Sequence, residues 1–274
     1  AVFRGGTSVA QGAGYLGGVV QMETKDARDF LGDEKYGATI RAGYKDNNYE
    51  NFNSITAYAL PVDGIDLLIN AVKRKSDDIR KPNGEIFSNT DENQESLLAK
   101  IEGYTLDSII SYSFRSSLDE GLEPYDLVSS GNNLFQNQFR RTEEKAHSLR
   151  GQYKGDLDEL DFVLGYIDKS FTEQNTQSNI SDFDPSKPIK YFQYDVWNLS
   201  LKSVSDLTER GMPLRLTFGI QATREERRST IKEEGAINEY KPQPSGTKDT
   251  KAVFMDGVFD FDPWRLQLGL RRDH

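Results

Sequence analysis

The sequence contains no cysteine, only two histidines and no long apolar run. Without cysteine, the chain cannot form disulfides, thiolate metal sites or a cysteine nucleophile. His147 and His274 do not supply the paired histidines of an H-E-x-x-H site, and no Ser-His-Asp arrangement occurs in a plausible register. No segment reaches the ~18–20 apolar residues of a transmembrane helix, but transmembrane β-strands conceal their apolar residues in alternation. We therefore expect no enzyme, no catalytic residue and no bound metal.

Basic charge is also in short supply, with 34 Lys and Arg against 44 Asp and Glu and a net charge of −10. Binding to phosphate backbones requires a basic footprint, so nucleic acid is not an expected partner. Apolar content is 36%, below the roughly 45–50% of an average globular domain. Aromatic residues nevertheless make up 11% of the chain, which argues against disorder. The composition favours many β-strands with one solvent-exposed face.

Glycines are concentrated near the start of the chain, where Gly12, Gly14 and Gly17 match the pattern G-x-G-x-x-G. That pattern binds a dinucleotide only when a strand precedes it and a helix begins at the third glycine. Here the β-branched and alternating residues 19–24 follow, which favour a strand. The glycines are better explained by tight backbone packing with positive φ angles.

Alternation of apolar and polar residues dominates the rest of the sequence. It is clearest in 36–45, 214–223 and 264–273, each about as long as a tilted strand that crosses a bilayer. Less regular alternation adds further strands, for a predicted total of eleven. The less regular strands are 51–60, 64–75, 93–103, 106–115, 145–154, 159–169, 189–202 and 250–261.

The connections between these strands alternate in length. The expected short turns are 61–63, 104–105, 155–158, 203–212 and 262–263. The expected loops are 46–50, 76–92, 116–144, 170–188 and 225–249. A soluble sandwich has no reason to place its long loops at one end, whereas a transmembrane barrel has short periplasmic turns and long outer loops. Interfacial aromatics such as Tyr36, Tyr44, Phe261 and Trp264 support an all-β, antiparallel transmembrane barrel.

Three stretches resemble TonB-dependent outer-membrane receptors. The first is residues 1–25 and the adjoining Asp26, where Phe3-Arg4-Gly5, the glycine stretch up to Val20 and Thr24-Lys25-Asp26 resemble the end of the plug domain in that family, although Gly6 and Tyr15 depart from its usual residues. Residues 254–257 and 268–274 resemble two mid-barrel strands, with Arg272 in place of a usual tyrosine. Landmarks between them, such as Asn83-Gly84 and Leu122-Glu123-Pro124, are similar to those of the haem and haemoglobin receptor branch.

The resemblance implies a domain division and a cellular location. Residues 1–33 would be the C-terminal end of the plug domain and its linker, and 34–274 the N-terminal half of the barrel, about the first 11 of 22 strands. An open half-barrel would leave two unpaired edges in lipid, so we expect a fragment of a protein more than twice as long. The plug backbone motif would comprise Arg4, Gly5, Gly12, Gly14, Gly17 and Gly18. The expected location is the outer membrane, in contact with its lipid and lipopolysaccharide.

The resemblance also implies a function and partners. A receptor of this kind would import haem, or haem from haemoglobin, with energy from the TonB complex, and would hold no permanent cofactor. Within the same fold, a siderophore or cobalamin receptor is the alternative. From other classes, a passive porin or adhesin barrel would lack a plug, and a soluble all-β binding protein would express without detergent.

Ligand contacts are expected from the long loops 116–144, 170–188 and 225–249. Aromatic walls and an axial His or Tyr suit haem. The candidate ligand-binding residues are Tyr125, Phe135, Phe139, Tyr240 and His274, with Tyr15 as a further alternative. His147 is expected at the outer start of a strand, facing lipid with Leu149 and Tyr153. Seven basic residues are expected on one face, as lumenal partners of acids: Arg41, Lys45, Arg150, Lys154, Arg215, Arg265 and Arg271.

Overall fold

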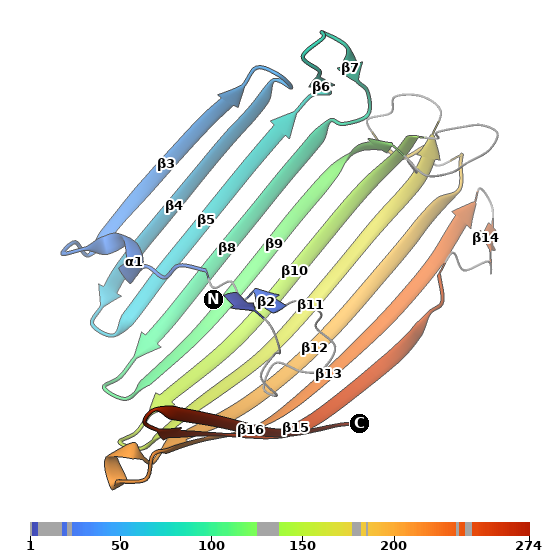
Figure 1. The fold of residues 1–274 in the computed structure, drawn as a ribbon. Coiled ribbons are helices and arrows are strands. Elements are labelled where there is room, and N and C mark those ends of the chain that lie inside the picture. The colour runs from blue at the N-terminus through green and yellow to red at the C-terminus, as the bar shows by residue number, and fades with distance from the viewer. Residues whose placement is uncertain are drawn as a thin grey trace.

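The computed structural model of the chain is dominated by one large antiparallel sheet (Figure 1). The structure describes residues 2–4, 18–20, 24–124, 137–176, 182–184, 186–233, 236–238 and 243–274. Consecutive long strands pair with each other from one edge of the sheet to the other. These strands are β3 (Tyr36–Lys45), β4 (Glu50–Val62), β5 (Ile65–Ser76), β8 (Glu92–Tyr104), β9 (Ser108–Pro124), β10 (Asn137–Lys154), β11 (Asp158–Thr176), β12 (Ile189–Asp206), β13 (Leu214–Glu233), β15 (Gly246–Phe261) and β16 (Trp264–Asp273).

Short elements accompany the large sheet. Two small pairs are formed by β1 (Val2–Arg4) with β2 (Gly18–Val20) and by β6 (Ile79–Arg80) with β7 (Ile86–Phe87). Strand β14 (Ala236–Asn238) pairs with the end of β13, the helix α1 (Arg28–Leu31) precedes β3, and a 3-10 turn covers Thr208–Arg210. Among the described residues, no helix has the length and apolar character needed to cross a membrane.

The eleven predicted strands are all present, and the alternation of short and long connections is confirmed. The predicted loop bounds were wrong, because β9 continues to Pro124, β11 to Thr176 and β13 to Glu233. In these extensions both faces of the strand carry polar or charged residues. The alternation that marks a half-apolar strand therefore disappears, although the backbone pairing continues.

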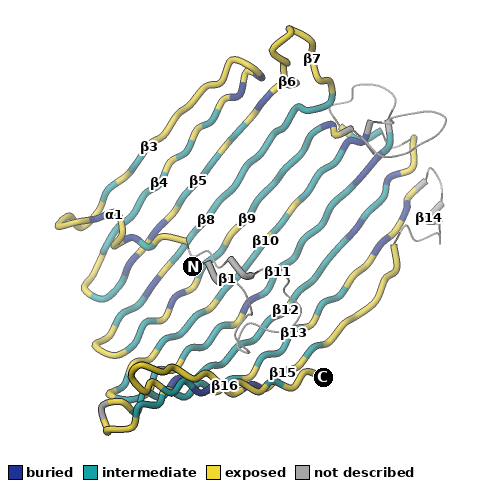
Figure 2. The backbone as a smooth tube through the Cα atoms, viewed as in Figure 1, coloured by how far each residue is buried: buried dark blue, intermediate teal, exposed yellow. Residues whose placement is uncertain are grey.

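The two faces of the sheet differ in chemistry. Residues paired directly across neighbouring strands point to the same face, so the register assigns each side chain to a face. One face carries exposed apolar residues along every long strand, among them Ile40, Ile110, Leu164, Ile220 and Leu268. We term this the outer face. The opposite, inner face is mostly polar, and Figure 2 shows that few of the strand residues are fully buried.

The apolar belt on the outer face runs obliquely to the strand register. Ile40 on β3 lies in a register row that passes through Lys145 on β10 and reaches Glu226 on β13. On β13, however, the outward apolar residues are Phe218 and Ile220, several residues closer to the short-turn end. The apolar residues therefore shift along the strand axis from β3 to β13, which means that the strands are tilted relative to the belt. Such a stagger is required of strands that close into a barrel.

Residues 24–31, which precede β3 in the chain, lie across the inner face of the sheet (Figure 1). We term them the docked segment and the sheet beneath them the wall. The best-packed part of the inner face is under this segment. Ala27 and Leu31 are almost fully buried against Leu68, and Phe30 stacks on Tyr58 with ring centroids 5.1 Å apart. Tyr58 in turn lies over Gly37, where a Cβ would collide with its ring. The docked segment is therefore seated in a small apolar socket on the inner face.

Ion pairs complete this seat. Asp66 on β5, 1% exposed, accepts hydrogen bonds from Arg28 Nε at 2.8 and 3.0 Å. The Arg28 guanidinium also lies over the Tyr104 ring, 4.2 Å from its centroid. Lys100 on β8 pairs with Asp26 of the docked segment and, at 3.2 Å, with Glu102 of its own strand. Charges that are buried on the wall are thus neutralised by the docked segment.

Candidate functional site

An aromatic cluster lies on the inner face, where β11 and β12 extend beyond the apolar belt toward the long connections. Phe171 and Phe192 stack with ring centroids 4.4 Å apart, and Tyr194 lies 5.6 Å from Phe171. Phe192 is 4% exposed, whereas Phe171 and Tyr194 are half-buried. The three rings form an apolar stack in a surrounding that is otherwise polar. We term Phe171, Phe192 and Tyr194 the aromatic wall.

Basic side chains surround the aromatic wall. The Arg227 guanidinium lies 5.4 Å from the centroid of the Tyr194 ring. Lys169, which is paired in register with Tyr194, lies 3.8 Å from Glu144. Arg140 is held between two carboxylates, 2.6 Å from Glu123 and 2.9 Å from Glu173. A ligand that carries both an aromatic ring and an anionic group would find matching partners in the aromatic wall and Arg227.

Residues 243–245, just before β15, contact the edge of this region. Ser229, 5% exposed, donates a hydrogen bond to the carbonyl oxygen of Gln243 at 2.6 Å. The Tyr194 hydroxyl donates to the Gln243 side-chain oxygen at 3.1 Å. Residues far apart in sequence, on β12, β13 and the segment before β15, therefore meet at one place on the inner face.

The sequence reasoning missed the aromatic wall because it assigned residues 170–188 to a loop. The signal that could have found it is the series Tyr191, Phe192 and Tyr194 near the start of the predicted strand 189–202. Alternate members of such a series share a face, so Phe192 and Tyr194 could have been placed side by side.

Phe139, a predicted ligand contact, packs against a neighbouring loop. It is 3% exposed, and its ring meets Phe183 edge-on with centroids 4.9 Å apart. Gln174, fully buried, holds that loop by donating to the carbonyl oxygen of Asp184 at 2.7 Å and accepting from its amide at 2.7 Å. This packing accounts for the burial of Phe139, and its contact with a ligand stays a prediction.

The two histidines lie on the outer face. His274 exchanges backbone hydrogen bonds with Lys251 and lines an outward hollow with Leu199 and Val253. The sequence left its direction open, and the structure turns it away from the inner face. His147 is on the outer face, as predicted, where its Nδ1 lies 2.8 Å from the Tyr112 hydroxyl. Its predicted place at the start of a strand was wrong, because β10 begins at Asn137.

Other predicted residues fall largely outside the described part of the chain. Tyr15, Tyr125, Phe135 and Tyr240 lie there, as do Gly5, Gly12, Gly14 and Gly17 of the plug motif. Of that motif, Arg4 on β1 pairs in register with Gly18 on β2. The roles of all these residues stay predictions, as does the division of the chain at residue 33.

Several of the predicted inner-face basic residues pair with acids of the wall itself. The pairs are Lys45 with Glu50 at 2.9 Å, Lys154 with Glu159 at 3.7 Å and Arg265 with Asp260 at 3.4 Å. These cross-strand pairs give the inner face a balanced polar lining. In the described residues, no group of three or more His, Asp or Glu side chains is placed to hold a metal ion.

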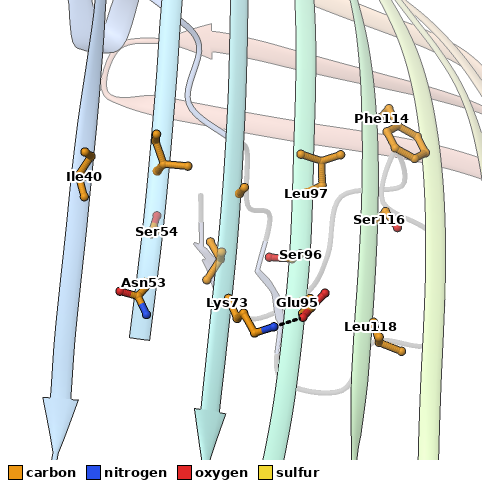
Figure 3. Close-up of a pocket in the computed structure, with 13 residues that line it drawn as sticks. Ile40, Asn53, Ser54, Lys73, Glu95, Ser96, Leu97, Phe114, Ser116 and Leu118 are labelled. Carbon is orange, nitrogen blue, oxygen red and sulfur yellow. Dashed lines mark hydrogen bonds and ion pairs between the residues drawn. The ribbon is translucent and has the colours of Figure 1, made fainter. Parts of the chain in front are cut away.

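Two further hollows on the outer face have volumes of about 740 and 890 Å³. Figure 3 shows the first, with Ile40, Leu97 and Phe114 around it and the Lys73–Glu95 ion pair, 2.5 Å long, at one end. Alanines such as Ala71 between larger neighbours create these hollows. Both belong to the apolar belt, so they suit acyl chains and do not form a site for an aqueous ligand.

An acidic pocket of about 550 Å³ lies under the connection from β5 to β8. Burial raises the pKa of the Asp91 carboxyl above its usual range, and the nearby Asp78 and Asp77 carboxylates raise it further. The connection comes close to the wall here, since a Cβ on Gly121 would collide with the carbonyl oxygen of Asp91. Deprotonation of Asp91 thus opposes the docking of this connection onto the wall.

Asp91→Asn is expected to stabilise this connection near neutral pH and to remove part of its pH dependence. A raised folded-state pKa contributes stability at low pH that is lost as the pH rises through that pKa. Amide exchange over 77–91 should slow about twofold at pH 7, because surface substitutions usually act within about 0.5 kcal/mol. Asp63→Asn, in a short turn at the other end of the sheet, is the control. Equal exchange over 77–91 in both variants would contradict the conclusion that deprotonated Asp91 opposes the docking of this connection.

Together, the oblique apolar belt, the polar inner face and the alternating connections define an outer-membrane β-barrel wall, with a segment docked on its lumenal side. The chain matches no protein-family model. It is 25% identical to the TonB-dependent heme receptor A of Haemophilus influenzae (strain 86-028NP) over 313 residues, which cover 100% of this chain and 41% of that receptor.

Solved structures agree on the fold. The FrpB iron transporter from Neisseria meningitidis superposes with a TM-score of 0.79 at 20% identity, over 99% of this chain and 46% of that one. The ferric enterobactin receptor PfeA from Pseudomonas aeruginosa gives a TM-score of 0.69 at 17% identity, over 100% of this chain and 43% of that one. The chain thus spans less than half the length of these proteins. The predicted outer-membrane barrel and the resemblance to TonB-dependent receptors are confirmed.

Proposed function

We propose that this chain is part of a receptor that takes up an iron-bearing ligand, haem in particular, through the outer membrane with energy from the TonB complex. The observation that carries the proposal is the docked segment, which is seated by buried ion pairs on the lumenal side of the wall. A passive porin or adhesin has no plug to anchor there. The names of the relatives describe receptors and transporters.

Haem is favoured over other cargo by two independent observations. The relative matched over the full length of this chain is named as a heme receptor. The aromatic wall and Arg227 offer a stack of apolar rings beside a cation, which suits an aromatic ring system with carboxylates. Siderophores remain the alternative, because a ferric enterobactin receptor shares the fold.

Haem titration of the full-length receptor in detergent tests the proposal. We expect a saturable change in the Soret band at one haem per receptor, because protein contacts alter the surroundings of the bound ring. Ferric siderophores and cobalamin, titrated in parallel by fluorescence quenching, should leave the protein signal unchanged. If haem caused no Soret change and a siderophore quenched the protein fluorescence, the ligand of the receptor would be that siderophore and not haem.

A further inference from the structure

The outer-face row at the border of the apolar belt changes in chemistry along the sheet. On β10, β11 and β12 it consists of the rings of His147, Tyr166 and Trp197, which are paired in register. Tyr166 and Trp197 contact each other, with ring centroids 4.4 Å apart. Aromatic side chains at this level are typical of the membrane interface. The same row continues to Arg224 on β13, so the border becomes basic there.

Lys251 on β15 and Arg272 on β16 extend the basic border. Toward the long connections, Lys251 is the next outward residue after the apolar Val253, and Arg272 is the next after the apolar Leu270. Because Val253 is paired in register with Arg272, Lys251 and Arg272 are diagonal neighbours roughly 7–8 Å apart, within reach of two long side chains. Both are exposed, and neither forms an ion pair with a carboxylate in the part of the chain that the structure describes.

Lys251 and Arg272 both line the outward hollow next to His274, which has a volume of about 310 Å³. Apolar lining comes from Leu199 on β12, Ile220 on β13 and Val253 on β15. The apolar part is continuous with the belt and suits an acyl chain. The two cations lie at the level of lipid headgroups, where basic side chains attract anionic lipids. The hollow therefore joins a surface for an acyl chain to a pair of cations that have no carboxylate partner among the described residues.

We propose that Lys251 and Arg272 hold a phosphate group of lipid A, the lipid anchor of lipopolysaccharide, with one of its acyl chains in the hollow. Long connections lie on the outside of an outer-membrane barrel, so this border is at the outer leaflet. Lipid A carries phosphate groups as well as acyl chains, and a phosphate accepts hydrogen bonds from both an ammonium and a guanidinium group. Arg224 is already 3.9 Å from Asp249 and adds a weaker contact. The proposal does not depend on which cargo the receptor takes up.

Native mass spectrometry of the full-length receptor in detergent, after removal of co-purified lipid, measures the binding of bisphosphorylated lipid A. Lys251→Gln and Arg272→Gln should each weaken this binding about fivefold, and the double variant about twentyfold, because each cation contributes to the attraction. Lys251→Arg keeps the charge and should bind lipid A within about twofold of the parent. Dephosphorylated lipid A should bind the parent about as weakly as lipid A binds the double variant.

Lys73→Gln is the matched control, because Lys73 is another outer-face lysine at the border of the belt but is already paired with Glu95. It should leave lipid A binding within about twofold of the parent. Equal weakening by Lys73→Gln, or undiminished binding of dephosphorylated lipid A, would overturn the phosphate contact. Inorganic phosphate and phosphatidylglycerol, added at the same concentration as lipid A, should not displace it. Displacement by phosphatidylglycerol would assign the hollow to a phospholipid, and displacement by inorganic phosphate would show that the acyl chain adds nothing; either result overturns the proposal.

Discussion

Arg28→Ala is expected to release the docked segment from the wall. The change leaves the Asp66 carboxylate buried, with 1% of its side chain exposed, and without its partner. Breaking a buried ion pair from one side costs about 3–5 kcal/mol. Since the Arg28 side chain is 47% exposed, we expect about 3 kcal/mol, the lower end of that range. Opening of the segment should become roughly a hundredfold more frequent.

Hydrogen exchange at the amides of Asp29 and Phe30 measures this opening, because both donate to carbonyl oxygens within the docked segment. Asp66→Asn should cost less, about 1–2 kcal/mol, since Arg28 can then turn toward water. Lys154→Ala, which breaks an exposed pair with Glu159, should change the exchange of these amides by less than about 1 kcal/mol. If Arg28→Ala and Lys154→Ala gave the same exchange, the docked segment would not depend on Asp66.

The fold could be predicted because the bilayer imposes a simple pattern on the sequence. Within the belt each strand must alternate, as Leu266, Leu268 and Leu270 do on β16. Outside the belt both faces meet water, so the strands near Glu120 and Glu173 lose the signal while their pairing continues. The number of strands therefore followed from the sequence, and their lengths did not.

The candidate site was harder to predict because it is assembled across the sheet. Phe171 and Phe192 meet only through the register of β11 with β12, which depends on turn geometry and not on either strand alone. The Arg28–Asp66 pair likewise joins a short helix to a strand 38 residues away. No local pattern distinguishes Asp66 from other wall acids.

The aromatic wall provides the second large effect. Phe192→Ala removes a ring that is 4% exposed, and truncation of a buried phenylalanine costs about 3–5 kcal/mol in stability. Phe171 and Tyr194 then lose their support, so haem affinity should fall about tenfold, the equivalent of one aromatic pair of about 1.4 kcal/mol.

Two matched variants separate ligand contact from general damage to the barrel. Phe218→Ala alters an outer-face ring that is 46% exposed and should leave haem affinity unchanged. Tyr194→Phe loses the hydrogen bond to Gln243 but keeps the stack of three rings, so affinity should stay within about twofold. Soret titrations of the three full-length variants give the affinities, and thermal unfolding gives their stabilities. Should Phe192→Ala lower stability and yet bind haem like the parent, the aromatic wall would hold β11 to β12 without touching the ligand, and the binding surface would have to lie in the long connections.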